Sequence, residues 1–156
     1  EEINWAVLWM VAGGFALGVA LNETGLAANL INAIPFNTWP VLAVLIGSGV
    51  ICYTLSNFIS NTATAALLVP ILAVVGKSMT AELAPIGGVA CLLIGIAVAA
   101  SVAMILPIST PPNALAHGTG MIEQKYMAKS GLIMGIIGLV LGYCMLVLLG
   151  SVGFFG

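Results

Sequence analysis

The polar stretch 56–62, which reads SNFISNT, lies between long apolar runs. Each of its hydroxyl and amide groups would cost several kcal/mol in hydrocarbon without a partner. Capping one helix end needs only one or two such groups, and a small cation uses neutral oxygens in place of its waters. The apolar run that follows Thr62 would also present a helix N-terminus, which attracts anions. The stretch therefore predicts a site for a cation, an anion or both.

A second polar stretch, STPPNA at 109–114, carries similar groups at a break in another apolar run. Pro107, Pro111 and Pro112 forbid a continuous helix, so backbone carbonyls are freed. A simple proline kink satisfied by neighbouring helices is the alternative interpretation. We expect a half-helix to resume over 114–121, with Asn113 as its N-cap. Together the two stretches match discontinuous helices that meet near a membrane midplane, with carbonyls for Na⁺ and helix N-termini for anions.

The elements that carry these stretches must be membrane helices. Hydrophobic residues make up 62% of the 156 residues and charged residues 5%, and the mean hydropathy is +1.23. These values exclude an ordinary water-soluble domain. Only three basic residues occur, so there is no basic patch for nucleic acid. We therefore predict an all-α polytopic membrane protein.

The apolar runs divide the chain into helices and breaks. The run 65–75 has about 11 residues, which at about 1.5 Å each cover half of a hydrocarbon core of about 30 Å. It is too short to cross, so we predict a re-entrant hairpin with the polar stretch at its tip. The expected elements are a spanning helix over 3–21, an interfacial helix over 25–35, a helix and re-entrant hairpin over 39–75 with its tip at 56–62, a broken helix over 83–121 with its break at 107–113, and a final spanning helix over 129–150.

Small residues in these runs predict close packing. Gly131, Gly135, Gly138 and Gly142 form one face of the last helix, which we expect to contact another helix. The three cysteines lack the spacing of metal ligands and are expected to be small core residues: Cys52, Cys91 and Cys144.

The charged residues lie at the ends of the runs. The sequence has no arginine, and Lys77, Lys125 and Lys129 flank the predicted spans. A bound anion would therefore be neutralised by helix dipoles and by co-bound cations, which gives a physical reason for Na⁺ coupling. His117 could relay a proton, although a histidine near a helix end more often faces a vestibule or donates to a carbonyl. No acid is placed to complete the triad of an intramembrane hydrolase.

The two polar motifs resemble those of a known family. SNTAT at 60–64 followed by LLVPI, and LPISTPPNALA at 106–116, are similar to the C-terminal half of the divalent anion:Na⁺ symporters, which transport dicarboxylates, citrate and sulfate. The resemblance covers the whole chain in the order spanning helix, interfacial helix, hairpin, broken helix and final helix. It implies that the chain is one of the two inverted repeats of such a transporter.

The resemblance also implies roles for individual residues. At the hairpin tip, Ser60, Asn61 and Thr62 would contact the substrate carboxylates. Thr110, Pro111 and Asn113 would border the substrate pocket from the broken helix. The Na⁺ ligands would be Ser56, the backbone carbonyl of Ile59, Asn61 and the backbone carbonyl of Ser109.

The resulting functional prediction is one half of a secondary active transporter. It would couple Na⁺ to uptake of a small divalent anion such as succinate by alternating access. The chain is expected to lie in the bilayer of the plasma (inner) membrane and to pair with the missing N-terminal repeat or with a second copy of itself. Two full transporters are expected to form a homodimer. Lys125 and Lys129, outnumbering Lys77, would lie on the inside. The alternatives are a noncatalytic membrane assembly or channel subunit, and a dicarboxylate exchanger that is not driven by Na⁺.

Overall fold

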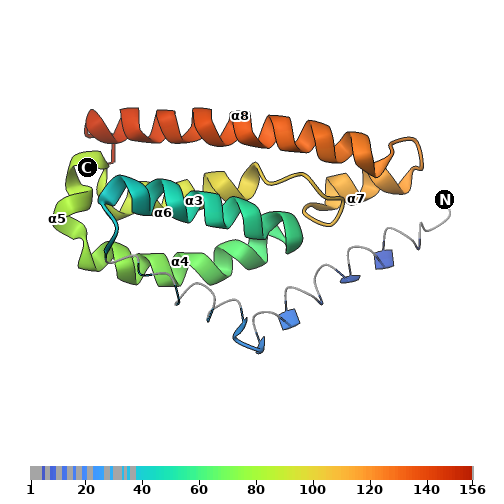
Figure 1. The fold of residues 1–156 in the computed structure, drawn as a ribbon, viewed down its shortest axis with the longest axis horizontal. Helices are drawn as coiled ribbons and strands as arrows, with labels where there is room; N and C mark the ends of the chain where they lie inside the picture. The colour runs from blue at the N-terminus through green and yellow to red at the C-terminus, as the bar shows by residue number, and fades with distance from the viewer. Residues whose placement is uncertain are drawn as a thin grey trace.

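The computed structural model describes residues 38–155 and scattered positions between 5 and 35 (Figure 1). The helices predicted over 3–21 and 25–35 therefore fall largely outside the described residues and stay predictions. Residues 38–155 include both polar stretches and the elements that carry them.

The described part of the chain is helical and contains no strand. Three helices are long and apolar enough to cross a membrane, and a bent pair adds a possible fourth crossing. This confirms the prediction of an all-α polytopic membrane protein. The elements are α3 (Val41–Phe58), α4 (Asn61–Ser78), α5 (Thr80–Leu83), the 3-10 helix η2 (Ala84–Ile86), α6 (Gly88–Ser101), α7 (Pro111–Gly118) and α8 (Gln124–Ser151).

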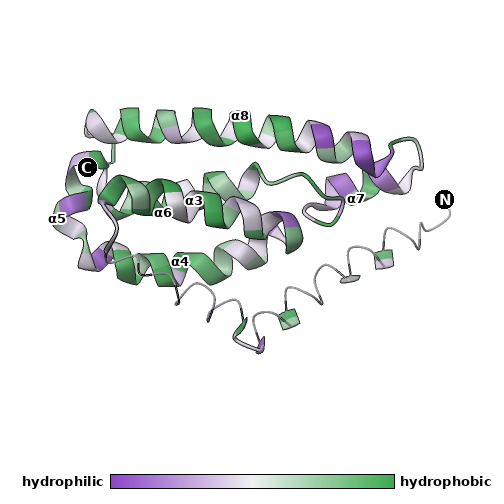
Figure 2. Ribbon diagram, in the orientation of Figure 1, coloured by the Kyte–Doolittle hydropathy of each residue, from purple (hydrophilic) through white to green (hydrophobic). Residues whose placement is uncertain are grey.

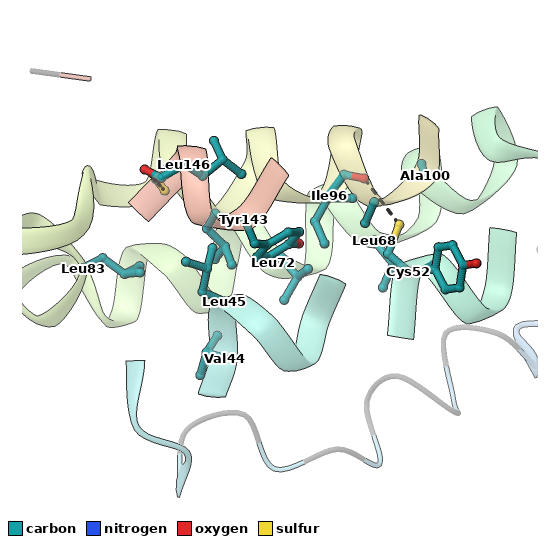
Figure 3. Close-up of a cluster of buried hydrophobic side chains, with 14 of the residues drawn as sticks. Val44, Leu45, Cys52, Leu68, Leu72, Leu83, Ile96, Ala100, Tyr143 and Leu146 are labelled. Carbon is teal, nitrogen blue, oxygen red and sulfur yellow. Dashed lines mark hydrogen bonds between the residues drawn. The ribbon is translucent and has the colours of Figure 1, made fainter. Parts of the chain in front are cut away.

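The long helices α3, α4, α6 and α8 run alongside one another (Figure 1). Apolar residues dominate their middle parts, and polar residues gather near their ends (Figure 2). The core lies between α3, α4 and α6, where Leu45, Leu68, Leu72 and Ile96 are fully buried (Figure 3). Large apolar side chains on the outer face of α8, such as Leu141 and Leu148, are exposed, as expected for a surface that meets lipid.

Helix α4 is longer than the sequence predicted. It has 18 residues and begins at Asn61, immediately after the tip. The statement that this segment is too short to cross is therefore wrong, because the polar residues 61–64 are helical and belong to its first turn. The tip itself is shorter than 56–62, since Ser56 and Asn57 still belong to α3. Whether the α3–α4 hairpin is re-entrant stays a prediction.

The break in the fourth run also begins earlier than predicted. Helix α6 ends at Ser101, and residues 102–110 connect it to α7 without an α-helix. Pro107 lacks the N–H that would continue the helix, and side-chain amides from other helices bind the backbone ahead of it. A second bend, of 69°, separates the α5–η2 segment from α6 at Gly87. Gly87 has φ +97°, a conformation that favours glycine.

The glycine face of α8 packs against the other helices, as its spacing predicted. A Cβ added at Gly131 would lie 2.3 Å from the carbonyl oxygen of Met104. At Gly138 and Gly142 the added atom would meet Val102 and Val98, at 2.9 and 2.6 Å. Glycine therefore lets the end of α6 and the connector 102–110 approach the backbone of α8.

Two of the three cysteines are core residues. Cys52 and Cys91 are buried, and their Sγ atoms lie 3.4 and 3.9 Å from the carbonyl oxygens of Ile96 and Leu146. The prediction for Cys144 is wrong, because this side chain is exposed. It lies two positions past Gly142, about 200° round the helix from the packed face.

Candidate functional site

The hairpin tip is built by the cap of α4. Ile59 and Ser60 are extended, and the Ser60 hydroxyl accepts a hydrogen bond from the backbone N–H of Ala63 at 3.2 Å. The Thr64 hydroxyl donates back to the Ser60 carbonyl at 3.2 Å. This local chemistry explains why α4 starts at Asn61, since a serine cap supplies an acceptor for the otherwise unpaired first turn. The first backbone N–H groups of α4 then point out of the tip.

Two oxygens at the tip are buried and have no hydrogen-bond partner among the described residues. They are the Ser56 Oγ and the Asn61 Oδ1. Ser56 is fully buried, as is Ser48 two turns earlier, yet the Ser48 hydroxyl donates to the Leu45 carbonyl at 3.1 Å. A buried polar atom without a partner costs about 1–3 kcal/mol. These two oxygens are therefore available to a ligand.

An open hollow lies beside the start of α4. Asn61, Thr62 and Val69 line it from α4, and small residues near the end of α6 form the other wall, including Ala97, Ala100 and Ser101. Its volume is about 550 Å³. The hollow thus brings two of the predicted substrate residues to an accessible surface.

At the break, Thr110 and not Asn113 caps the resumed helix. The Thr110 side chain accepts from the backbone N–H of Asn113 at 3.4 Å, and Pro111 occupies the first helical position. The prediction of Asn113 as the N-cap is therefore wrong. Proline suits the first position because it needs no N–H partner and its φ is already helical, so the helix starts two residues before Asn113.

The Leu106 carbonyl accepts hydrogen bonds from several donors near the break. The backbone N–H of Ser109 donates to it at 3.1 Å, and so does the buried Ser109 hydroxyl. The side-chain amide of Asn113 donates to the Met104 carbonyl at 3.0 Å and reaches Leu106 at 3.5 Å. The backbone at 104–109 is thereby held in one conformation.

The structure groups the predicted substrate residues into two sets. Ser60, Asn61 and Thr62 lie at the start of α4, and Thr110, Pro111 and Asn113 lie at the start of α7. Asn113 lines a second open hollow of about 610 Å³, together with Tyr126, Lys129 and Ser130. The two hollows have no lining residue in common.

Asn57, which lies in the first polar stretch and has no predicted role, bonds the end of α3 to the connector that precedes α7. Its Oδ1 accepts from the backbone N–H of Ile105 at 2.8 Å, and its Nδ2 donates to the Tyr53 carbonyl at 2.8 Å. Its side chain is only 3% exposed. An amide inside an apolar run signals a buried partner, but that partner lies 48 residues away, and nothing in the local pattern identifies it.

The donor set suits a hard monovalent cation better than a transition metal. Within the described residues, no group of three or more His, Cys, Asp and Glu side chains could hold a metal. Hydroxyl, amide and carbonyl oxygens are the ligands of alkali cations. His117 lies with its Nδ1 3.2 Å from the Ile122 carbonyl, at the C-terminal end of α7, which agrees with the expected contact to a carbonyl.

Comparison with known families identifies the group to which the chain is related. A family model described as the sodium:sulfate symporter transmembrane region matches residues 1–153. The chain belongs to this family. Membership of the sodium:sulfate symporter family agrees with the resemblance that the two polar motifs indicated.

Individual relatives of this symporter family are transporters. The chain is 38% identical over 139 residues to an uncharacterized transporter of Haemophilus influenzae, covering 88% of the chain and 29% of that protein. It is 34% identical to the Na⁺/dicarboxylate cotransporter 3 of Rattus norvegicus over 90% of the chain and 23% of the relative. The sodium-dependent dicarboxylate transporter SdcS of Staphylococcus saprophyticus is also 34% identical, over 90% of the chain and 26% of its own length. The chain therefore spans about a quarter of the length of these relatives.

Proposed function

We propose that this chain forms one wall of a Na⁺-coupled dicarboxylate transporter. In this proposal Ser60, Asn61 and Thr62 bind the substrate carboxylates from the hairpin tip. Thr110, Pro111 and Asn113 border the same substrate from the break. The two relatives named for dicarboxylate transport and the family description support the substrate class and the coupling ion.

The observation that carries the proposal is the pair of buried, unpartnered oxygens on Ser56 and Asn61. In the proposal both contribute to a Na⁺ site, which is completed by the backbone carbonyls of Ile59 and Ser109. Na⁺ here is a transported co-substrate. Its binding would offset the desolvation of these two oxygens, which have no partner in the part of the chain that the structure describes.

Na⁺ and the anion would bind cooperatively. Lys129 of α8 lines the hollow beside α7 together with Asn113, and none of the three lysines lines the hollow beside α4. At the hairpin tip, neutralisation of a dicarboxylate then depends on the N-terminus of α4 and on co-bound Na⁺. Each bound cation lowers the electrostatic cost of placing an anion nearby, so uptake would be driven by the Na⁺ gradient.

The chain would act with a companion. We propose that a second, inverted repeat supplies the opposite wall, and that the hairpin and the broken helix move against the remaining helices in alternating access. Two such complete transporters would form a homodimer in the plasma (inner) membrane. The hollows beside α4 and α7 would then line parts of one pathway when the companion is in place.

The test is uptake of labelled succinate into proteoliposomes that hold these residues together with the companion repeat. We expect saturable uptake under an inward Na⁺ gradient and little uptake when choline replaces Na⁺. Asn61→Ala should reduce uptake at least a hundredfold. The control is Thr54→Val, because Thr54 is exposed and its hydroxyl donates to the Val50 carbonyl of its own helix. This variant should leave uptake unchanged.

Two other results would lead to different functions. Uptake that depends on internal dicarboxylate and ignores the Na⁺ gradient would indicate an exchanger and overturn the coupling. Absence of saturable uptake in protein that is folded by its melting profile would indicate a noncatalytic subunit.

A further inference from the structure

We propose that Asn57 is a positioning residue that fixes the two halves of the Na⁺ site relative to each other. The inference rests on the proposed function, because it concerns the ligands assigned there, and it adds a residue with no assigned role. Asn57 bonds to no proposed ligand side chain. It acts through the backbone of Ile105.

Asn57 lies in the last turn of α3, at the start of the hairpin tip. It lies between two proposed ligands, directly after Ser56 and two residues before Ile59. Its Nδ2 bond to the Tyr53 carbonyl locks the side chain against its own helix. The buried amide is therefore a rigid extension of the tip, since it is 3% exposed and its Nδ2 and Oδ1 both have a partner.

Hydrogen bonds within the break connect Ile105 to Ser109 through Leu106. Asn57 Oδ1 holds the Ile105 N–H at 2.8 Å, and the next residue, Leu106, accepts the Ser109 backbone N–H at 3.1 Å. The Ser109 hydroxyl also returns to Leu106. The position of the proposed Ser109 carbonyl ligand is thereby tied to the helix that carries Ser56, through the Asn57–Ile105 bond and the two bonds from Ser109 to Leu106.

The connector 102–110 also contacts α7 and α8, so removal of the Asn57 bond should change only its attachment to α3. Asn113 binds the Met104 carbonyl from the side of α7, and Gly131 of α8 allows close contact with the Met104 carbonyl. These contacts hold the connector to α7 and α8. The Asn57 side chain holds the connector to α3 by its hydrogen bond to the Ile105 N–H. Loss of this bond should let the tip and the break separate while the connector keeps its other contacts.

The prediction is specific to Na⁺ binding. Without the Asn57 bond, part of the Na⁺ binding free energy must bring the ligands on the tip and on the break together. The Na⁺ concentration for half-maximal uptake should therefore rise at least tenfold. At saturating Na⁺ the site is again assembled, so the maximal rate should remain within about twofold of the unmodified protein. A merely structural role would instead lower the yield and the maximal rate without changing the Na⁺ requirement.

The experiment uses Asn57→Thr and Asn57→Asp in the complete transporter. A threonine hydroxyl can still bond the Tyr53 carbonyl one turn back but is too short to bridge to Ile105, so this variant should show the raised Na⁺ requirement. Aspartate keeps the acceptor for the Ile105 N–H, and its protonated form, which burial favours, can still donate to the Tyr53 carbonyl. Its Na⁺ requirement should therefore be close to that of the unmodified protein. Thr54→Val, on the same helix, is the matched control and should change neither value.

Hydrogen exchange of the Ile105 amide provides a readout independent of transport. We expect protection in the unmodified protein and in Asn57→Asp, and at least tenfold faster exchange in Asn57→Thr. Unchanged Ile105 exchange in Asn57→Thr would overturn the bridge. Faster exchange with an unchanged Na⁺ requirement would overturn the positioning role, whereas Na⁺-independent uptake by the unmodified protein would overturn the proposed function itself.

Discussion

The phenol of Tyr53 on α3 occupies the space above Gly135 on α8. A Cβ added at Gly135 would lie 2.3 Å from the Tyr53 hydroxyl oxygen. The relationship is reciprocal, because Tyr143 of α8 covers Gly49 of α3, where an added Cβ would lie 1.9 Å from its hydroxyl oxygen. Both hydroxyls are buried and have no hydrogen-bond partner in the part of the chain that the structure describes. Helices α3 and α8 are therefore complementary in shape at two contacts, each of which places a tyrosine of one helix against a glycine of the other.

Gly135→Ala should destabilise the protein by about 1–2 kcal/mol, because overpacking outweighs the gain in helix propensity. Tyr53→Phe alone should be neutral or stabilising, since it removes a buried hydroxyl without a partner. The double variant should recover part of the loss, with a coupling energy of about 0.5–3 kcal/mol. Thermal unfolding in detergent measures all three. Strict additivity of the two changes would contradict the direct contact.

Gly131→Ala and Gly142→Ala should differ, although both lie on the same face of α8. At Gly131 the added atom meets backbone, the Met104 carbonyl oxygen and the Ile105 Cα, whereas at Gly142 it meets the end of the Val98 side chain. The Val98 side chain can shift at some cost, since a β-branched residue has few rotamers in a helix, whereas the backbone at 104–105 is also held by bonds from Asn57 and Asn113. We expect a loss of more than about 2 kcal/mol for Gly131→Ala and less than about 1 kcal/mol for Gly142→Ala, measured as shifts of the unfolding midpoint. Equal shifts would show that the connector yields easily.

The contrast between these glycines shows what periodicity can predict. Spacing of small residues identified the packed face of α8, because that face follows from helix geometry alone. The same spacing could not tell that Gly131 faces a backbone carbonyl and Gly142 a side chain. That difference depends on the connector 102–110, whose course is set by contacts from several helices.

The boundaries near the polar stretches were predicted less well, for local and long-range reasons. Apolarity alone started α4 at Ala65, but the Ser60 cap and the Thr64 hydroxyl bond make the polar residues 61–64 helical. Apolarity also extended the fourth run to Leu106. There the Asn57 bond to Ile105 spans 48 residues and no sequence pattern identifies it.

Ser60 variants should separate capping from substrate binding. Asparagine and aspartate are both good N-caps. Ser60→Asn and Ser60→Asp should therefore each keep the unfolding midpoint within about 2 °C of that of the unmodified protein. Ser60→Ala, which removes the cap, should lower the free energy of unfolding by about 1 kcal/mol. Only aspartate adds a negative charge where a dicarboxylate is proposed to bind. We expect a rise of at least tenfold in the succinate concentration for half-maximal uptake with Ser60→Asp relative to Ser60→Asn. The same value for both variants would place the substrate away from the tip.

Labelling of introduced cysteines should establish the orientation, because the native Cys52 and Cys91 are buried. The end of α4 that carries Lys77 and the start of α8 that carries Lys125 lie at opposite ends of the helix stack (Figure 1). With the exposed Cys144 replaced by alanine, Lys77→Cys should react with an impermeant maleimide on intact cells, and Lys125→Cys only after permeabilisation. The reverse pattern would invert the assignment, and reaction of both on intact cells would contradict a position on opposite sides of the membrane.

Ser56→Ala and Ser48→Ala form a matched pair on α3 that tests the proposed Na⁺ site directly. Both side chains are fully buried, but among the described residues only the Ser48 hydroxyl has a hydrogen-bond partner, the Leu45 carbonyl. Ser48→Ala should therefore cost about 1 kcal/mol of stability and leave the Na⁺ requirement of uptake unchanged. Ser56→Ala should leave stability unchanged or raise it in the absence of Na⁺, because it removes an unpaired polar atom from the interior.

The functional cost of Ser56→Ala should appear only with Na⁺. In the unmodified protein, Na⁺ that binds the folded state should raise the unfolding midpoint as its concentration rises. Ser56→Ala should lose most of this stabilisation and require at least tenfold more Na⁺ for half-maximal uptake, and Ser48→Ala should retain both. A Ser56→Ala protein that is less stable without Na⁺, yet keeps the full Na⁺-dependent shift, would mean that the hydroxyl has a structural partner and no role as an ion ligand.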